Sequence, residues 1–142
     1  PGPNDSVLEI GTGSGFLTAC LARLAEKVES IDIREEFVRD AADRLKTISG
    51  LSPALHCADG LAVDFSDRYD VIVVTGALPI YDDCFERALT PGGRLFVVVG
   101  APPVRAAWLV TADAAGGTRR DVLFETDIPE LCHARQPERF AF

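Results

Sequence analysis

The sequence predicts an α/β fold built on a doubly wound, mostly parallel sheet, and three observations support this prediction. Through the first hundred residues, short β-branched apolar runs alternate with segments whose apolar residues recur at helical spacing. The apolar runs at 69–75 and 94–100 are nearly continuous, as in parallel strands that are covered on both faces. Beyond residue 105 the helical spacing disappears, which predicts an antiparallel hairpin at the C-terminal end.

Length and composition indicate one globular domain over residues 1–142, long enough to bury a core. The chain is 47% hydrophobic and 25% charged, as globular proteins are. Its net charge of −8 and lack of a basic patch argue against nucleic acid as a partner. No apolar stretch approaches the roughly 20 residues that span a bilayer, and no signal peptide opens the chain. We therefore expect a cytoplasmic location and no membrane partner.

The beginning of the chain is unusual. The sequence contains no methionine, and the turn-like segment 1–5 leads directly into the first predicted strand. We therefore expect that the domain is truncated at its N-terminus.

The first predicted strand, at 7–10, enters a glycine-rich loop that is followed by a helix over 16–24. Glycines at alternate positions permit backbone conformations that other residues avoid, and they leave no Cβ between the loop and a ligand. The free N–H groups at the helix start favour an anionic or polar group in the same gap. The residues predicted to form this nucleotide-cofactor loop are Gly11, Thr12, Gly13, Ser14 and Gly15.

The spacing of the loop distinguishes two classes of cofactor. A dinucleotide-binding loop needs a glycine at the position that Phe16 occupies here. Glu9, just before the loop, would repel a diphosphate and attract a sulfonium or ammonium group. The pattern Glu-x-Gly-x-Gly-x-Gly at 9–15 resembles the first motif of the class I S-adenosylmethionine-dependent methyltransferases.

The second predicted unit is a strand at 28–33 and a helix over 34–48. Asp32 follows Gly11 at the spacing of about 20 residues at which an acidic side chain binds the ribose hydroxyls. A carboxylate suits this role because it accepts two hydroxyl hydrogen bonds at once. We predict that Asp32, with Ile33 beside it, belongs to the cofactor site; an exposed Asp at a strand end is the alternative.

A third strand is predicted at 53–58, followed by Asp59, Gly60 and Leu61. An Asp-Gly pair at the end of a strand can present a carboxylate and open backbone to an adenine edge, and it is also an ordinary turn. The glycine loop at the same edge of the sheet favours the adenine site. We expect His56, within the strand, to be a half-buried structural residue.

The strongest strand is predicted at 69–75, where it enters a loop at 75–79. Thr75 would then lie beside the glycine loop, at the point where the strand order reverses and where ligands bind in such sheets. A short helix over 83–89, closed by a Thr-Pro-Gly-Gly turn, leads to the buried strand at 94–100.

The last predicted elements are strands at 106–112 and 119–126, joined by a turn at 113–117. We expect the loop-like tail at 129–142 to fold back onto the domain with its two late phenylalanines. These are Phe140 and Phe142.

The cysteines indicate neither a metal site nor a disulfide framework, because they are far apart and only two histidines accompany them. We expect buried or incidental thiols and no metal. Cys132 and His133 are neighbours whose side chains would point apart on a strand, so no catalytic dyad is expected.

Several segments together resemble the protein-L-isoaspartate O-methyltransferase family, which methylates isoaspartyl carboxyl groups in damaged proteins. They are VLEIGTGSGFLTACLA at 7–22, Ala-Asp-Gly at 58–60, YDVIVVTGA at 69–77, LTPGGRLFVVVG at 89–100 and, more weakly, LFETDIPEL at 123–131.

This resemblance implies a Rossmann-like methyltransferase sheet, S-adenosylmethionine as cofactor with S-adenosylhomocysteine as product, and isoaspartyl peptides or proteins as substrates of a repair reaction. It implies that Glu9 and the loop at 11–15 lie at the methionine end, and that Asp32 lies on the ribose. Asp59, Gly60 and Leu61 would lie near the adenine.

Two departures from the family are visible. The family has a segment before the first strand whose hydroxyl lies beside the substrate carboxylate, and this chain starts after it. The second strand ends in Asp32 where the family often has Glu, a change that should preserve ribose binding. The first departure concerns catalysis more than cofactor binding.

The expected chemistry explains why no catalytic residue is identified. A carboxylate acceptor is already ionised at pH 7, so methyl transfer needs orientation and exclusion of water more than a general base. The alternatives are a methyltransferase with another acceptor and a non-catalytic module that binds the cofactor. Phe16 and Glu9 disfavour a nicotinamide-dependent oxidoreductase.

Overall fold

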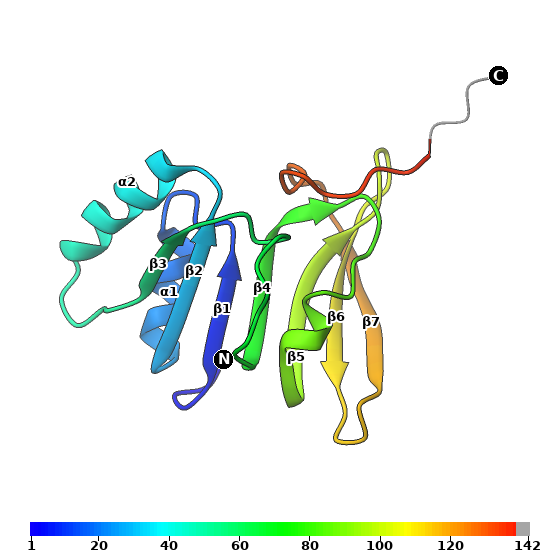
Figure 1. Ribbon diagram of the computed structural model, residues 1–142, viewed down its shortest axis with the longest axis horizontal. Helices are drawn as coiled ribbons and strands as arrows, with labels where there is room; N and C mark the ends of the chain where they lie inside the picture. Colours follow the sequence, from blue (N-terminus) through cyan, green and yellow to red (C-terminus); the bar gives the residue numbers. More distant parts are fainter. Residues whose placement is uncertain (139–142) are drawn as a thin grey trace.

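Residues 1–138 are described by the computed structural model, in which seven strands form one sheet in the order β3-β2-β1-β4-β5-β6-β7 (Figure 1). The pairs from β3 to β5 are parallel, and β6 pairs antiparallel with β5 and with β7. The strands are β1 (Ser6–Ile10), β2 (Lys27–Asp32), β3 (Ala54–Cys57), β4 (Tyr69–Leu78), β5 (Leu89–Val99), β6 (Ala106–Ala112) and β7 (Thr118–Glu125). The predicted parallel sheet with a C-terminal antiparallel hairpin is confirmed.

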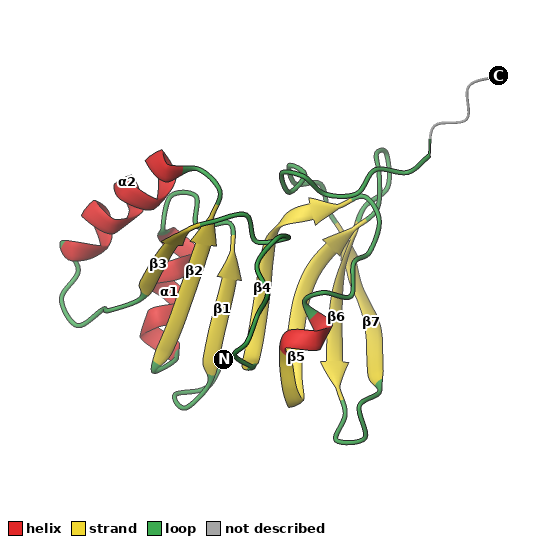
Figure 2. Ribbon diagram, viewed as in Figure 1, coloured by secondary structure: helices red, strands yellow, loops and turns green. Residues whose placement is uncertain are grey.

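Both α-helices, α1 (Phe16–Leu24) and α2 (Glu35–Lys46), accompany the half of the sheet formed by β1, β2 and β3 (Figure 2). Leu21 of α1 is buried in a cluster with Val7 of β1 and Val28 of β2. α2 carries acidic residues in its first turn and basic residues in its last, which complements the helix dipole. These two helices follow the strands whose carboxyl ends carry the predicted cofactor residues.

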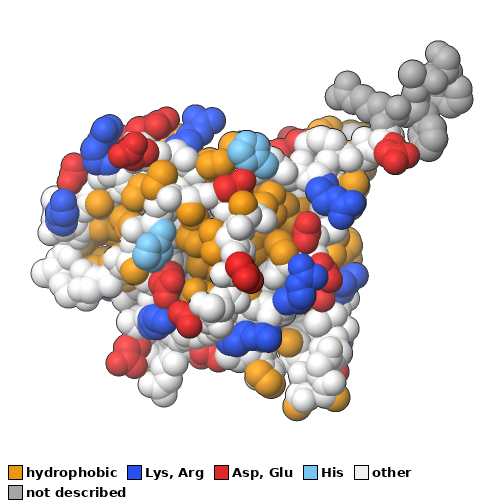
Figure 3. Space-filling model, in the orientation of Figure 1, with side chains coloured by type: hydrophobic (Ala, Val, Ile, Leu, Met, Phe, Trp, Pro, Cys, Tyr) orange, Lys and Arg blue, Asp and Glu red, His pale blue; other side chains and the backbone are white. Residues whose placement is uncertain are grey.

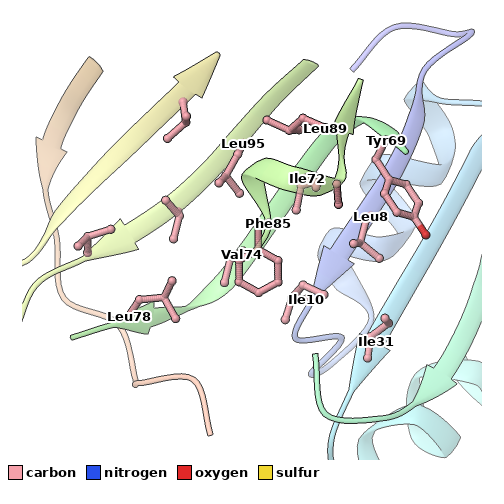
Figure 4. Close-up of a cluster of buried hydrophobic side chains, with 14 of the residues drawn as sticks. Leu8, Ile10, Ile31, Tyr69, Ile72, Val74, Leu78, Phe85, Leu89 and Leu95 are labelled. Atoms are coloured by element: carbon pink, nitrogen blue, oxygen red, sulfur yellow. The ribbon is translucent and has the colours of Figure 1, made fainter. Parts of the chain in front are cut away.

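The largest hydrophobic cluster lies on the opposite face of the sheet from α1. Leu8, Ile72 and Leu95 are side by side on three neighbouring strands of this face, and all are fully buried. Phe85 covers them from the segment between β4 and β5 (Figure 4). On the surface shown in Figure 3, hydrophobic side chains gather at the centre and charged side chains surround them.

The structure corrects two predicted boundaries of β4 and β5. The sequence predicts a loop at 75–79, but β4 continues to Leu78. It also predicts a turn at 90–93, but β5 already begins at Leu89. Register shifts occur at two places in the ladder between these strands. Such irregularities let glycine and proline lie within a paired strand, which sequence patterns read as a turn.

The predicted helix at 83–89 is also wrong. A single 3-10 turn, η1 (Glu86–Ala88), is present instead. Before it, the Asp82 carboxylate accepts a hydrogen bond from the Cys84 amide at 2.9 Å, and the Phe85 side chain is completely buried. The local side-chain bond and the anchoring of Phe85 favour a turn over a helix too short to be stable alone.

The predicted hairpin is confirmed, and its turn is closed by the Asp113 carboxylate, which accepts hydrogen bonds from the amides of Ala115 and Gly117. Phe140 and Phe142, predicted to fold back onto the domain, lie outside the described residues. Within residues 1–138, no helix is long and apolar enough to cross a membrane.

Candidate functional site

A pocket of about 390 Å³ lies at the carboxyl ends of the central strands, where the strand order reverses between β1 and β4. It brings together residues from four separate segments that the sequence predicts to be functional. The predicted residues that line it are Gly11, Gly13, Asp32, Ile33, Asp59, Gly60 and Thr75. The predicted residues outside its lining are Glu9, Thr12, Ser14, Gly15 and Leu61.

Hydrogen bonds to both neighbouring strands hold the glycine loop in place. The Gly11 amide donates to the carbonyl of Ile31 at 2.7 Å, which ties the loop to β2. The Thr75 hydroxyl lies 2.9 Å from the carbonyl oxygen of Ile10 and 2.8 Å from that of Gly11, which ties the loop to β4. The loop is therefore positioned by the sheet on both sides.

Asp32 closes one side of the pocket, and backbone amides orient its carboxylate. Oδ2 accepts a hydrogen bond from the Gly13 amide at 2.9 Å, and Oδ1 accepts one from the Arg34 amide at 3.0 Å. Each carboxylate oxygen has a second lone pair, so Asp32 retains two acceptor positions for a ligand. This arrangement suits a pair of hydroxyl groups.

Glu9 lies beneath the loop rather than in the pocket, and its side chain is completely buried. Its Oε2 accepts hydrogen bonds from the hydroxyls of Thr18, in α1, and Ser30, in β2. Because Ser30 donates its only hydroxyl hydrogen to Glu9, the Thr12 hydroxyl must donate to Ser30, at 2.6 Å. Glu9 thus connects loop, helix and strand, and a direct contact with the cofactor stays a prediction.

Burial raises the pKa of Glu9 above its ordinary value of 4.5. The hydrogen bonds from Ser30 and Thr18 oppose this effect, and the nearby charge of Asp32 adds to it. Glu9 Oε1 has no hydrogen-bond partner among the described residues, which is consistent with a carboxylate that is costly to ionise.

Glu9→Gln is expected to make the stability of the domain less dependent on pH. Since the pKa of Glu9 is higher in the folded than in the unfolded chain, its contribution to stability is complete below about pH 4.5. That contribution is lost as the pH rises through the folded-state pKa. Urea unfolding of both proteins from pH 4.5 to 8 measures the difference, and parallel curves would contradict the expectation.

At the far side of the pocket, Asp59 is held by two hydrogen bonds. Its Oδ1 accepts the Leu61 amide at 3.0 Å, and its Oδ2 lies 2.7 Å from Nδ1 of His133. Burial raises the pKa of Asp59, but these two hydrogen bonds outweigh it and leave the pKa below the usual value. Asp59 is therefore ionised at neutral pH. Gly60 is buried against Ile10, where a Cβ would lie 2.7 Å from a side-chain carbon.

The remaining loop residues lie around the pocket. Ser14 is exposed at the tip of the loop, and Gly15 packs against Ala41 of α2, where a Cβ would lie 2.9 Å from the Ala41 Cβ. Leu61 contributes its side chain to the large hydrophobic cluster and its amide to Asp59. These residues support the pocket from outside it.

One wall of the pocket was not predicted. Pro129, Glu130, Leu131 and Cys132, in the tail after β7, line the side that faces β4. The tail is attached there because the Ala77 amide donates to the carbonyl of Pro129 at 2.8 Å. The predicted folding of the tail back onto the domain is confirmed at residues 129–131. The tail has no periodic pattern, so the sequence indicates its position at the pocket only through the weak similarity at 123–131.

The prediction for His56 is wrong, and the one for the cysteines is not. The His56 side chain is exposed rather than half-buried, because β3 is the edge strand on its side of the sheet. The four cysteines, expected to be buried or incidental thiols, are all free: Cys20 and Cys84 are partly buried, and Cys57 and Cys132 are exposed. Within residues 1–138, no group of three His, Cys, Asp or Glu side chains is arranged to hold a metal ion.

Comparison with known proteins identifies sequence relatives. A family model described as protein-L-isoaspartate(D-aspartate) O-methyltransferase matches residues 2–121. Protein-L-isoaspartate O-methyltransferase 1 of Cupriavidus necator is 41% identical over 117 residues, which cover 82% of this chain and 45% of the relative. The enzyme of Ectopseudomonas mendocina is 37% identical over 119 residues, covering 83% and 56%. The chain thus spans about half the length of these curated relatives.

Solved structures show the same fold. A crystal structure of a protein-L-isoaspartate O-methyltransferase homologue from Plasmodium falciparum, in complex with S-adenosyl-L-homocysteine, matches with a TM-score of 0.80 at 16% identity. The match covers 92% of this chain and 66% of that one. A second protein-L-isoaspartate O-methyltransferase matches with a TM-score of 0.79 at 23% identity, covering 91% and 42%.

Proposed function

The chain belongs to the protein-L-isoaspartate(D-aspartate) O-methyltransferase family, and we propose that it uses S-adenosylmethionine to methylate the carboxyl group of L-isoaspartyl residues in damaged proteins. The observation that carries this proposal is the pocket that joins the glycine loop, Asp32 and the Asp59-Gly60 pair. Its relatives are named for this activity.

The residues around the pocket fit this cofactor. Asp32 keeps two acceptor positions for the ribose hydroxyls, and ionised Asp59 supplies an acceptor for the adenine amino group. Gly13 lines the pocket, and a Cβ there would meet no atom within 4 Å, so the loop is open at this position, to which we assign the methionine part. We assign Ile33 and Gly60 to the nucleoside end and Gly11 to the methionine end.

We propose that the other predicted residues support the residues that contact the cofactor. Thr75 and Thr12 fix the loop, and Glu9 places a buried acidic group beneath it, near the methionine end. Ser14, Gly15 and Leu61 belong to the supporting layer. We propose a cytoplasmic location, as the sequence leads us to expect. We propose neither nucleic acid nor a membrane as a partner.

When bound, S-adenosylmethionine supplies a methyl group on a sulfonium, ready for displacement by a carboxylate. The residues of this chain bind and orient the cofactor, and the tail at 129–132 keeps water from one side of the pocket. No side chain need accept a proton, because the acceptor is ionised at pH 7.

The proposal is tested by methyl transfer from radiolabelled S-adenosylmethionine to two peptides of one sequence, one containing L-isoaspartate and the other L-aspartate. Incorporation into the isoaspartyl peptide alone is expected. Incorporation into a different acceptor, such as a small carboxylic acid, would show a methyltransferase of another specificity. Cofactor binding without transfer to any acceptor would leave only a cofactor-binding module and contradict the proposed activity.

A further inference from the structure

The tail after β7 is fixed to the body of the domain on one side of the pocket. Arg105, which is almost completely buried, donates hydrogen bonds to the Ile128 carbonyl at 2.7 Å and to the Glu130 carboxylate at 2.7 Å. Leu131 then donates its amide to the Ala77 carbonyl at 2.9 Å. Up to Leu131, the path of the tail is therefore determined by β4 and by Arg105, directly before β6.

Beyond Leu131, the side chain of one tail residue contacts the opposite side of the pocket. His133 reaches Asp59, with 2.7 Å between Nδ1 and Oδ2. Because an ionised carboxylate only accepts hydrogen bonds, Nδ1 of His133 carries the hydrogen. This bond joins two segments that are 74 residues apart in the chain. It fastens the tail, directly after the lining residue Cys132, to Asp59 on the other side of the pocket.

The backbone at His133 is unusual and supports a specific role for this contact. His133 has a φ of 63°, and among residues 1–138 it is the only residue other than glycine with a positive φ. The left-handed conformation is unfavourable for a side chain with a Cβ. Such a conformation persists where surrounding contacts require it, and the one residue that adopts it here is the one whose imidazole contacts Asp59.

The two partners of Asp59 leave its carboxylate little freedom to rotate. The Leu61 amide holds one oxygen and His133 holds the other. Without His133, a single hydrogen bond would remain, and the carboxylate plane could turn about its last torsion angle, which has a broad energy minimum. The direction in which Asp59 offers its remaining lone pairs therefore depends on His133.

We infer that His133 is a positioning residue for the cofactor: it orients the Asp59 carboxylate toward the adenine amino group and ties the tail to the nucleoside end of the pocket. This inference rests on the proposed function, because it requires the adenine to lie beside Asp59. Selectivity for adenine then depends on the hydrogen bond between His133, in the tail, and Asp59, in the turn after β3.

Two substitutions separate the side chain from the backbone. Asparagine and glycine both tolerate a positive φ, but only asparagine carries a side-chain N–H that can replace Nδ1. We would titrate the unaltered 142-residue chain, His133→Asn and His133→Gly with S-adenosylhomocysteine. The same chains would be titrated with its analogue that carries hypoxanthine in place of adenine, since hypoxanthine presents an oxygen instead of the amino group.

His133→Gly is expected to bind S-adenosylhomocysteine about three- to tenfold more weakly and to lose most of its preference over the hypoxanthine analogue. His133→Asn should retain both. If His133→Gly matches the unaltered chain in affinity and preference, the role of His133 is refuted while the proposed function stands. If the unaltered, folded chain binds neither compound, the proposed function fails and the inference fails with it.

Discussion

Gly11→Ala is expected to destabilise the domain by about 2–5 kcal/mol, because it combines an unfavourable backbone conformation with a steric overlap. Gly11 has a φ of 100°, and a Cβ there would overlap the Thr75 hydroxyl. That hydroxyl cannot easily move away, since it is fixed between the carbonyls of Ile10 and Gly11. Chemical unfolding monitored by circular dichroism measures the loss.

Gly13→Ala is the matched control for this substitution. Gly13 also has a positive φ, 51°, but a Cβ there would meet no atom within 4 Å. Its cost should be limited to the left-handed backbone, about 1–2 kcal/mol. Equal stability of the two variants would contradict the role of the contact between Gly11 and Thr75.

Asp32→Ala is expected to weaken binding of S-adenosylmethionine about 100-fold, which corresponds to the loss of two hydrogen bonds to a charged group. Equilibrium dialysis with the radiolabelled cofactor measures this change. Asp43→Ala, on the exposed side of α2, removes the same charge outside the pocket and should leave affinity unchanged. Unchanged binding by a folded Asp32→Ala protein would show that the ribose does not lie on Asp32.

The parallel half of the sheet could be predicted because its signals are local. Apolar periodicity distinguishes the strands from the two helices. The number of residues between Gly11 and Asp32 indicates that the ends of β1 and β2 lie side by side. The carboxyl ends of parallel strands share one edge of the sheet. The positions of Asp59 and Thr75 in the pocket can therefore be inferred from the predicted strands that they follow or end. The predicted residues that line the pocket could therefore be identified without knowledge of the structure.

The rest depends on contacts between distant segments. Sequence spacing gives no sign that Glu9 is enclosed by Thr18 and Ser30 beneath the loop, because a carboxylate before a loop could point either way. The hydrogen bond from His133 to Asp59 is equally invisible, since the tail has no periodicity and its path is set by Arg105. The glycines within β5 match a turn pattern in the sequence, and they lie in a strand because its pairing with β4 is irregular.

Calorimetric titration of the chain with S-adenosylhomocysteine shows whether this pocket binds the cofactor of the proposed reaction. We expect saturable binding at one site, with a dissociation constant on the order of 1–100 μM, corresponding to about −8 to −5 kcal/mol. Absence of heat from a chain shown to be folded by circular dichroism would contradict a cofactor site in this pocket.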